Sequence, residues 1–150
     1  MKIGIIAEGH SDRLIIQALL KRIKEIDSSQ IIPIRPVNSQ DETDRHDVRE
    51  FSNWTIVLEE CGNEETFEDF FDTVDEDRYI VVQIDTAECE EKGYDVPRPN
   101  RSGRIDLNAY SVELRSRVIE KLQTLIPARY HDRILYAVSI EELEAWLIPI

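Results

Sequence analysis

Two apolar runs of this chain each end in a carboxylate. Ile3 to Ala7 precede Glu8, and Tyr79 to Ile84 precede Asp85. Short apolar runs rich in β-branched residues predict buried strands, and parallel strands bring their last residues to one sheet edge, where open α/β sheets bind ligands. Two such carboxylates repel each other unless a cation lies between them, and oxygen ligands favour Mg²⁺ or Mn²⁺ over zinc. We therefore expect a divalent-cation site held by Glu8 and Asp85.

The residues after Glu8 are suited to an anion. Gly9, His10 and Ser11 lead into an amphipathic helix expected from about Asp12 to Ile26. The unpaired N–H groups at a helix start favour phosphate, and a neighbouring metal would polarise that phosphate for attack. His10 is a candidate proton shuttle. The plainer interpretation is that Gly9 makes the turn, Ser11 caps the helix, His10 is a turn residue and Glu8 is solvated.

The end of the chain supplies a third candidate acid. We expect a last helix to start at Ser139, because Glu142 follows it at the spacing of a capping box. Glu141 in the first turn suits the helix dipole. Glu144 has the weakest structural role of the three and is therefore the candidate for a third catalytic and metal-binding acid. The apolar residues that follow, up to Ile150, are expected to pack into the core or against a partner, unless the chain is a shortened form of a longer ancestor.

Arginines are concentrated in the segment after Asp85. Arg98, Arg101 and Arg104 lie in an irregular stretch expected from Thr86 to about Leu107. Long loops inside a compact domain are usually functional or disordered, and these side chains would be placed to hold a phosphate backbone. The alternative is that they keep an exposed loop soluble and pair with the acid-rich residues 59–77.

Acidic residues are concentrated in another segment. Residues 59–77 contain ten Asp or Glu and no Lys or Arg. Four apolar residues interleaved with them predict a short helix with one buried face: Phe67, Phe70, Phe71 and Val74. The acids are then the solvated side of that helix, or a docking surface for a basic partner.

Strand and helix patterns alternate along the chain, which predicts an α/β fold with a mostly parallel sheet of about four strands flanked by helices. Pro33 and Pro36 place the second strand at an edge, and the apolar run before Asp85 suits the centre. The expected strands are Lys2–Ala7, Ile31–Val37, Tyr79–Ile84 and Arg133–Val138. The other expected helices are Asp47–Cys61, with Phe51, Trp54, Val57, Leu58 and Cys61 on one face, and Asn108–Ile126, with Leu114, Val118, Leu122 and Leu125 on one face.

Composition limits the class of protein. A length of 150 residues suits one domain spanning 1–150, and a net charge of −13 argues against indiscriminate binding to polyanions. Cys61 and Cys89 fit neither a zinc site nor a disulfide framework, which suits a reducing cytoplasm. The apolar N-terminal run is too short for a signal peptide or a membrane span, so we expect a cytoplasmic protein with no membrane association.

Three of these features together resemble Toprim domains, the metal-binding folds of topoisomerases, primases and OLD-family nucleases. The opening strand with Glu8, Gly9 and Asp12 resembles their first motif, and Asp85 falls where they place an Asp-x-Asp motif. The terminal EELEAWL, residues 141–147, is similar to the Glu-x-Trp helix of OLD-like and RloB-like Toprim proteins, which occur with ABC-type ATPases in prokaryotic anti-phage systems.

The resemblance implies a Toprim-like Rossmannoid domain that is a Mg²⁺- or Mn²⁺-dependent nuclease acting on DNA or RNA. Glu8 and Asp85 would bind the metal, with Glu144 as an additional acid, and an ABC-type ATPase or a second copy of the chain would be a partner. The second Asp of Asp-x-Asp is replaced by Ala87, and the adjacent Glu88 is the candidate substitute ligand.

Two other functional classes stay open. A weakened Toprim-fold module would dock a partner protein through its acidic flank and apolar end, and Ala87 favours this interpretation. A phosphoacceptor receiver domain would also use an Asp that closes the third strand. Receivers need an acidic pair after the first strand and a late Lys, whereas this chain has Glu8 alone and no Lys beyond Lys121.

Overall fold

A four-stranded parallel sheet forms the centre of the molecule. The computed structural model describes residues 1–35, 53–72, 77–101, 103 and 106–143. The sheet has the order β2-β1-β3-β4, and each neighbouring pair is parallel. Its strands are β1 (Lys2–Ile6), β2 (Ile31–Arg35), β3 (Arg78–Asp85) and β4 (Ile134–Ser139). The expected α/β class is confirmed, and the arrangement is Rossmann-like.

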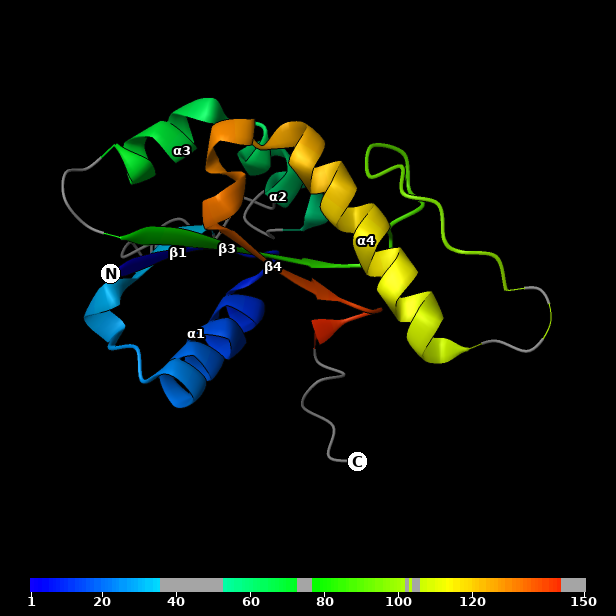
Figure 1. The fold of residues 1–150 in the computed structure, drawn as a ribbon, viewed down its shortest axis with the longest axis horizontal. Helices are drawn as coiled ribbons and strands as arrows, with labels where there is room; N and C mark the ends of the chain where they lie inside the picture. The colour runs from blue at the N-terminus through cyan, green and yellow to red at the C-terminus, as the bar shows by residue number, and fades with distance from the viewer. Residues whose placement is uncertain (36–52, 73–76, 102, 104–105, 144–150) are drawn as a thin grey trace, which may run out of the picture.

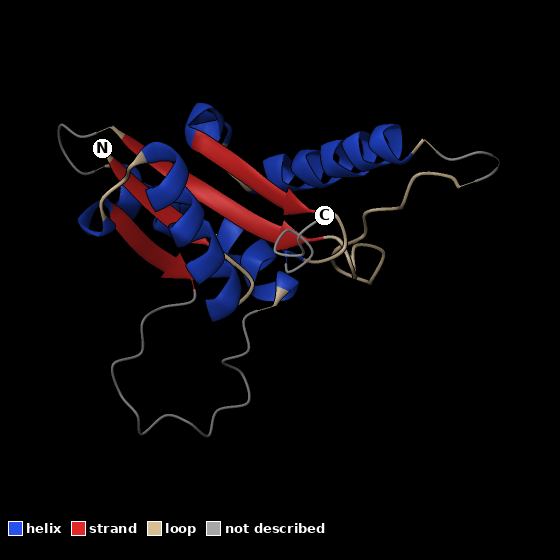
Figure 2. Ribbon diagram, turned by 90° about the horizontal axis from the view of Figure 1, so that it is seen from below, coloured by secondary structure: helices blue, strands red, loops and turns tan. Residues whose placement is uncertain are grey.

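Helices cover both faces of this sheet. Helix α1 (His10–Lys24) lies on one face, and α2 (Trp54–Cys61), α3 (Glu64–Phe71) and α4 (Leu107–Leu125) lie on the other (Figure 1). Short 3-10 helices, η1 (Ser28–Gln30) and η4 (Ala128–Arg133), lead into β2 and β4. Seen from the side of α1, that helix covers the half of the sheet that contains β2 and β1 (Figure 2). Leu135 of β4 is accordingly 48% exposed.

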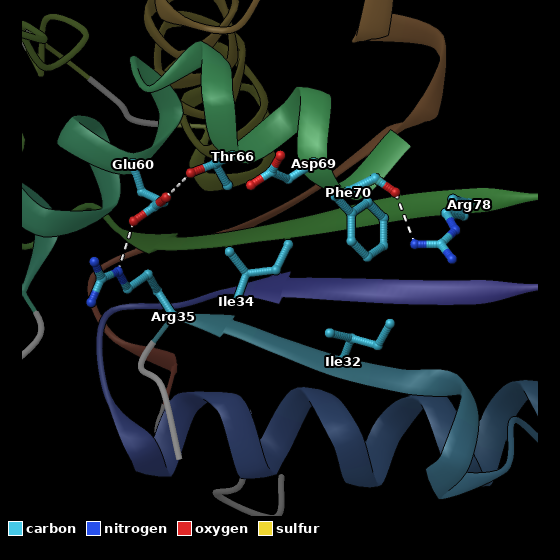
Figure 3. A pocket seen from close by; sticks show the side chains of 8 residues that line it. All are labelled: Ile32, Ile34, Arg35, Glu60, Thr66, Asp69, Phe70 and Arg78. Carbon is cyan, nitrogen blue, oxygen red and sulfur yellow. Dashed lines mark hydrogen bonds and ion pairs between the residues drawn. The ribbon is translucent and has the colours of Figure 1, made fainter. Parts of the chain in front are cut away.

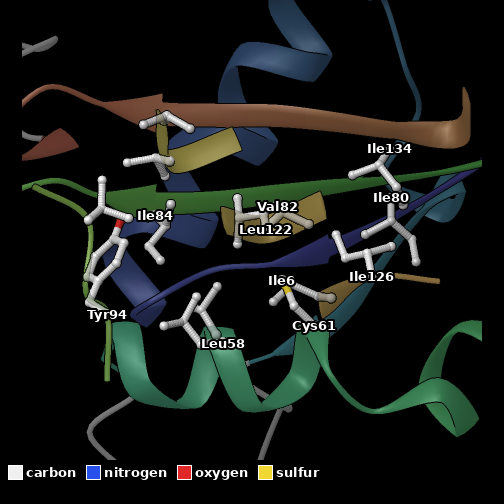
Figure 4. Packing of buried hydrophobic residues seen from close by; sticks show 14 of the residues in the cluster. Ile6, Leu58, Cys61, Ile80, Val82, Ile84, Tyr94, Leu122, Ile126 and Ile134 are labelled. Carbon is white, nitrogen blue, oxygen red and sulfur yellow. The ribbon is translucent and has the colours of Figure 1, made fainter. Parts of the chain in front are cut away.

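The larger core cluster lies between the sheet and the helices α2, α3 and α4. Alternate residues of β3 point into it, as strand periodicity requires. The predicted buried positions of α4 are confirmed for Leu114, Val118 and Leu122. Close packing around α2 and the sheet is visible in Figure 4, which labels Ile6, Leu58, Cys61, Ile80, Val82, Ile84, Tyr94, Leu122, Ile126 and Ile134.

The acidic segment buries its aromatic side chains as predicted. Phe67, Phe70 and Phe71 of α3 are all buried, while Val74 lies outside the described residues. Some of the acids form ion pairs on the outer side: Arg129 contacts Glu64 at 2.8 Å and Glu68 at 2.6 Å. These pairs support the interpretation of the segment as the solvated side of a packed helix.

Helix boundaries and faces differ from expectation in two places. Helix α2 starts at Trp54 and not near Asp47, because Asn53 has an extended backbone and its side chain accepts a hydrogen bond from Thr55 N at 2.9 Å. The helix expected from about Asp12 to Ile26 is observed as His10–Lys24, and its apolar residue Ile23 is 67% exposed. The helix instead turns Asp12, Arg13 and Ile16 inward.

The described part of the segment after β3 is irregular, as expected, but it is not an exposed loop throughout. Cys89, Tyr94 and Val96 belong to the larger core, so the described part of this segment is packed against the fold. Cys61 and Cys89 are free and buried. Burial raises the pKa of the Cys61 thiol to about 12, which leaves it protonated and unreactive.

Candidate active site

Glu8 and Asp85 meet at the carboxyl edge of the sheet. The chain passes from β1 to β2 on one side and crosses to β3 on the other, so β1 and β3 are neighbours at the switch point. Asp85 N donates a hydrogen bond to Glu8 Oε1 at 2.6 Å. No described group bonds the second Glu8 oxygen, Oε2, which is left for a ligand.

Gln83 links these two acids, and the sequence analysis missed it. Its amide oxygen accepts a hydrogen bond from Glu8 N at 3.0 Å, and its Nε2 donates to Asp85 Oδ1 at 2.7 Å. The side chain is fully buried. The available signal was a single amide within the apolar run that precedes Asp85, because a buried amide requires hydrogen-bond partners.

Glu8 is electrostatically strained as an anion. Burial, followed by the charges of Asp85, Asp12 and Glu88, raises its pKa from 4.5 to about 8, against the lowering effect of the Asp85 N–H bond. Glu8 is therefore a half-buried, hydrogen-bonded carboxyl group rather than a fully solvated one. A cation beside Glu8 would relieve the desolvation and the repulsion together.

Gly9 and Asp12 shape the start of α1 next to Glu8. Gly9 is the N-cap residue with an extended backbone, φ −142° and ψ 171°, which any residue can adopt. Glycine is therefore required there for steric reasons and not for its backbone conformation. A Cβ there would lie 2.8 Å from Asp12 Oδ2. Asp12 is buried, and it is a further acid that the predicted ligand set omitted. The Glu8-x-x-x-Asp12 spacing was the signal for it.

His10 and Ser11 lie in the first turn of α1, where both are exposed. The helix begins before Ser11, so Ser11 is not its cap. Both side chains lie close along the chain to Glu8 and are accessible to a ligand. The expected phosphate-facing position of this turn stays a prediction.

The other predicted metal ligands are only partly placed. Glu88 is exposed in the turn after β3, close enough to raise the pKa of Glu8, and Ala87 stands between it and Thr86. Glu144 lies outside the described residues. Within the described ranges, no group of three or more His, Cys, Asp or Glu side chains is arranged to hold a metal ion.

Arg98 is bonded to the protein itself. Its guanidinium donates to Glu141 Oε1 at 2.6 Å, to Thr86 O at 2.8 Å and to Ala87 O at 3.0 Å. The side chain is 19% exposed. These bonds join the turn after β3 to the residues after β4, so Arg98 positions the edge that carries Asp85.

Arg101 keeps more of its side chain in solvent, at 56% exposure. It lies 4.7 Å over the Tyr110 ring and donates to the Tyr110 hydroxyl at 3.0 Å. Arg104 lies outside the described residues. Arg101 is thus the described loop arginine that is most available for a phosphate.

The expected helix start at Ser139 is wrong. Ser139 is the last residue of β4 and pairs with Asp85, while Glu141 has a left-handed backbone with φ 67° that a helix does not allow. Glu141 N instead donates to Thr86 Oγ1 at 2.8 Å. Beyond this turn, Leu143 N approaches Asp85 Oδ2 at 3.3 Å. Sheet pairing therefore outweighs the local capping pattern.

A surface pocket of about 420 Å³ lies between α3 and the edge strand β2 (Figure 3). Its charged groups are used within the protein. Arg35 Nε contacts Glu60 at 2.7 Å, Thr66 donates to the same carboxylate, and Arg78 donates to Phe70 O at 2.9 Å. The pocket is thus a hollow beside the edge strand whose lining contains neither Glu8 nor Asp85.

Comparisons with known proteins provide no family assignment. The chain matches no protein-family model, and neither a curated protein nor a solved structure shows significant similarity to it. Among the helices that the structure describes, none combines the length and apolar character required to cross a membrane.

Proposed function

We propose that this protein is a Toprim-like, Mg²⁺-dependent phosphodiesterase that hydrolyses DNA or RNA at the carboxyl edge of its sheet. The observation that carries this proposal is the joining of Glu8 and Asp85, since Asp85 N bonds Glu8 Oε1 at 2.6 Å while Oε2 has no described partner. A half-buried carboxyl group with its pKa raised to about 8 beside other acids is a favourable place for a cation.

The donor set fits a hard divalent ion. Glu8 and Asp85 would bind it through carboxylate oxygens, which Mg²⁺ and Mn²⁺ prefer. Glu88, Glu144 and Asp12 are the candidates for completing its coordination. When bound, such an ion neutralises charge on a phosphoryl oxygen and promotes formation of the attacking hydroxide.

The other residues of the site bind and orient. Gln83 and the Asp85 N–H hold the Glu8 carboxylate in position, an outer layer of the kind that tunes metal sites. Gly9, His10 and Ser11 at the start of α1 would face the scissile phosphate. Arg101 and Arg104 would contact the neighbouring backbone, while Arg98 keeps the turn after Asp85 in place.

The test is metal-dependent cleavage by a matched pair of variants. Glu8→Gln retains an oxygen for the Asp85 N–H bond but loses the charge, so we expect Mn²⁺ binding by calorimetry and nicking of DNA or RNA to fall by at least about tenfold. Glu8→Ala should behave alike. The control Glu65→Gln removes an exposed carboxylate of α3 and should leave both unchanged. Undiminished cleavage by both Glu8 variants would refute the proposal.

A non-catalytic version of the same fold is the second candidate. Ala87 at the position of the second expected acid favours it. This module would dock a partner protein, and the resemblance to defence-associated Toprim proteins points to an ABC-type ATPase or a second copy of the chain. Absence of Mg²⁺ and Mn²⁺ binding together with a stable protein complex would select this candidate over the nuclease.

A further inference from the structure

Another surface groove, of about 280 Å³, lies between α2, the turn after β3 and the last turns of α4. The start of α2 supplies Trp54 and Leu58, the turn after β3 supplies Lys92 and Gly93, and the last turns of α4 supply Lys121 and Leu125. Three separate segments thus meet around one hollow. Its size is close to the lower end for small-ligand pockets.

The aromatic wall of this groove is firmly positioned. The rings of Trp54 and Tyr94 lie 5.4 Å apart at 31°, and the Tyr94 hydroxyl donates to Asp85 O at 2.9 Å. Gly93, with φ 107°, lies beside the edge of the indole, where a Cβ would be 3.5 Å from Trp54. Tyr94 therefore connects Trp54, which lines the groove, to the backbone of Asp85 in the proposed active site.

The cations of the groove are available for a ligand. Neither the Lys92 nor the Lys121 ammonium group forms an ion pair or hydrogen bond within the described part of the chain. One carboxylate, Glu59, also lines the groove, so its charged side chains sum to a positive value.

We infer that this groove binds one nucleotide unit of a single-stranded nucleic acid, with the base against Trp54 and the phosphate between Lys92 and Lys121. An aromatic platform beside cations is the general means of holding single strands, since every base can stack and every phosphate is anionic. The inference rests on the proposed function, for which the groove would hold the strand next to the scissile phosphate. It adds to the carboxylate site a subsite that binds the strand without taking part in the hydrolysis itself.

The test measures binding without cleavage. A short oligothymidylate is titrated in EDTA into the full chain carrying Glu8→Gln and Trp146→Phe, so that Trp54 is the remaining tryptophan. We expect its fluorescence to be quenched. Trp54→Leu should weaken binding about tenfold, measured by anisotropy of a labelled strand. Because Trp54→Leu also loses a core contact, its fold is checked by circular dichroism.

Substitutions of the charged groove residues test the inference independently if Trp54→Leu fails to fold. Lys92→Gln and Lys121→Gln should each weaken binding and reduce the slope of log K against log salt by about 0.7. Glu59→Gln should strengthen it. The matched controls are Lys21→Gln on α1 and Glu65→Gln on α3, which should change neither affinity nor slope.

Failure of this inference is distinguishable from failure of the proposed function. Absence of oligothymidylate binding, or an affinity that neither lysine substitution changes, would refute the inference. Equal binding of polyglutamate would also overturn it, since that polymer has charge without bases. Groove-dependent binding by a wild-type chain that never cleaves would support the groove and count against hydrolysis. Cleavage by the lysine variants at the wild-type kcat/KM would support hydrolysis at the carboxylate site and count against the groove.

Discussion

The Glu8 carboxyl group is held by bonds that favour one position and by surroundings that disfavour its charge. Its backbone N–H bonds Gln83, and its side chain accepts the Asp85 N–H. Burial and three neighbouring acids nevertheless raise its pKa to about 8. A protein that retains a carboxylate in such a place without a cation loses stability on ionisation, which makes Glu8 the most informative single residue of the chain.

This strain predicts a pH dependence of stability. In the absence of divalent ions, the unfolded chain releases the Glu8 proton near pH 4.5 and the folded chain near pH 8, so the folded state binds more protons between these values. The contribution of Glu8 to the free energy of unfolding should therefore fall as pH rises through this window and level off above it. The fall is up to about 4 kcal/mol, since one pKa unit corresponds to about 1.4 kcal/mol and the partly exposed carboxyl relaxes some of the shift.

The measurement is urea denaturation in EDTA between pH 4 and pH 9 for wild type and Glu8→Gln. The variant lacks the titrating group, so its stability relative to wild type should increase with pH. Mg²⁺ at pH 8 should stabilise wild type and not the variant. A stability difference that is independent of pH would contradict this account of Glu8.

At the scale of elements, β1 determines both the position of Glu8 and the packing of α3 on the sheet. It lies between β2 and β3, and its carboxyl end delivers Glu8. Gly4 in its middle lets the side chains of neighbouring elements approach. A Cβ at Gly4 would lie 2.5 Å from Ile34 Cδ1 of β2 and 3.1 Å from the Phe70 ring of α3. The close contact of α3 with the sheet edge therefore depends on this glycine.

Gly4→Ala should overpack the interface between β1, β2 and α3. We expect a loss of about 1–3 kcal/mol in the free energy of unfolding, because Ile34 and Phe70 must both move. The matched control is Gly62→Ala, where the backbone has φ −86° and a Cβ would meet its nearest atoms at 3.5 Å. That control should be neutral or stabilising by up to about 1 kcal/mol, since alanine restricts the unfolded chain. Equal effects of the two substitutions in chemical denaturation would refute the packing argument.

At the scale of the whole molecule, the dominant electrostatic property is excess negative charge. The net charge of −13 includes the acid-rich residues 59–77, and only part of that charge is offset by pairs such as Arg129 with Glu68. Like charges spread over a small surface repel each other and oppose the compact state.

Screening of this repulsion should stabilise the fold. Raising NaCl from about 10 mM to about 150 mM shortens the screening length from about 30 Å to about 8 Å, so we expect Tm to increase by a few degrees. Choline chloride at the same ionic strength should act alike, because the effect requires no specific cation. A decrease in Tm with both salts would show that attractive pairs such as Arg98 with Glu141 dominate instead.

Much of the architecture could be predicted from the sequence, because strands and helices leave periodic apolar patterns. The run before Asp85 predicted a central strand, Pro33 predicted an edge strand, and the spacing of Leu114, Val118 and Leu122 predicted the buried face of α4. Carboxylates at the ends of two strands also predicted where Glu8 and Asp85 would lie, since a parallel sheet brings those ends together.

Only the tertiary structure decided how that edge is bonded. Arg98 contacts Glu141, which lies 43 residues away along the chain, and Glu8 bonds Gln83 across 75 residues. Ser139 continues β4 because Asp85 pairs with it, although its local pattern resembles a helix cap. Hydrogen bonds between distant residues depend on strand order and register, and these are set by the packing of the whole sheet. The sequence by itself determined the chemical groups and the layers, and the tertiary structure decided which groups remain available to a ligand.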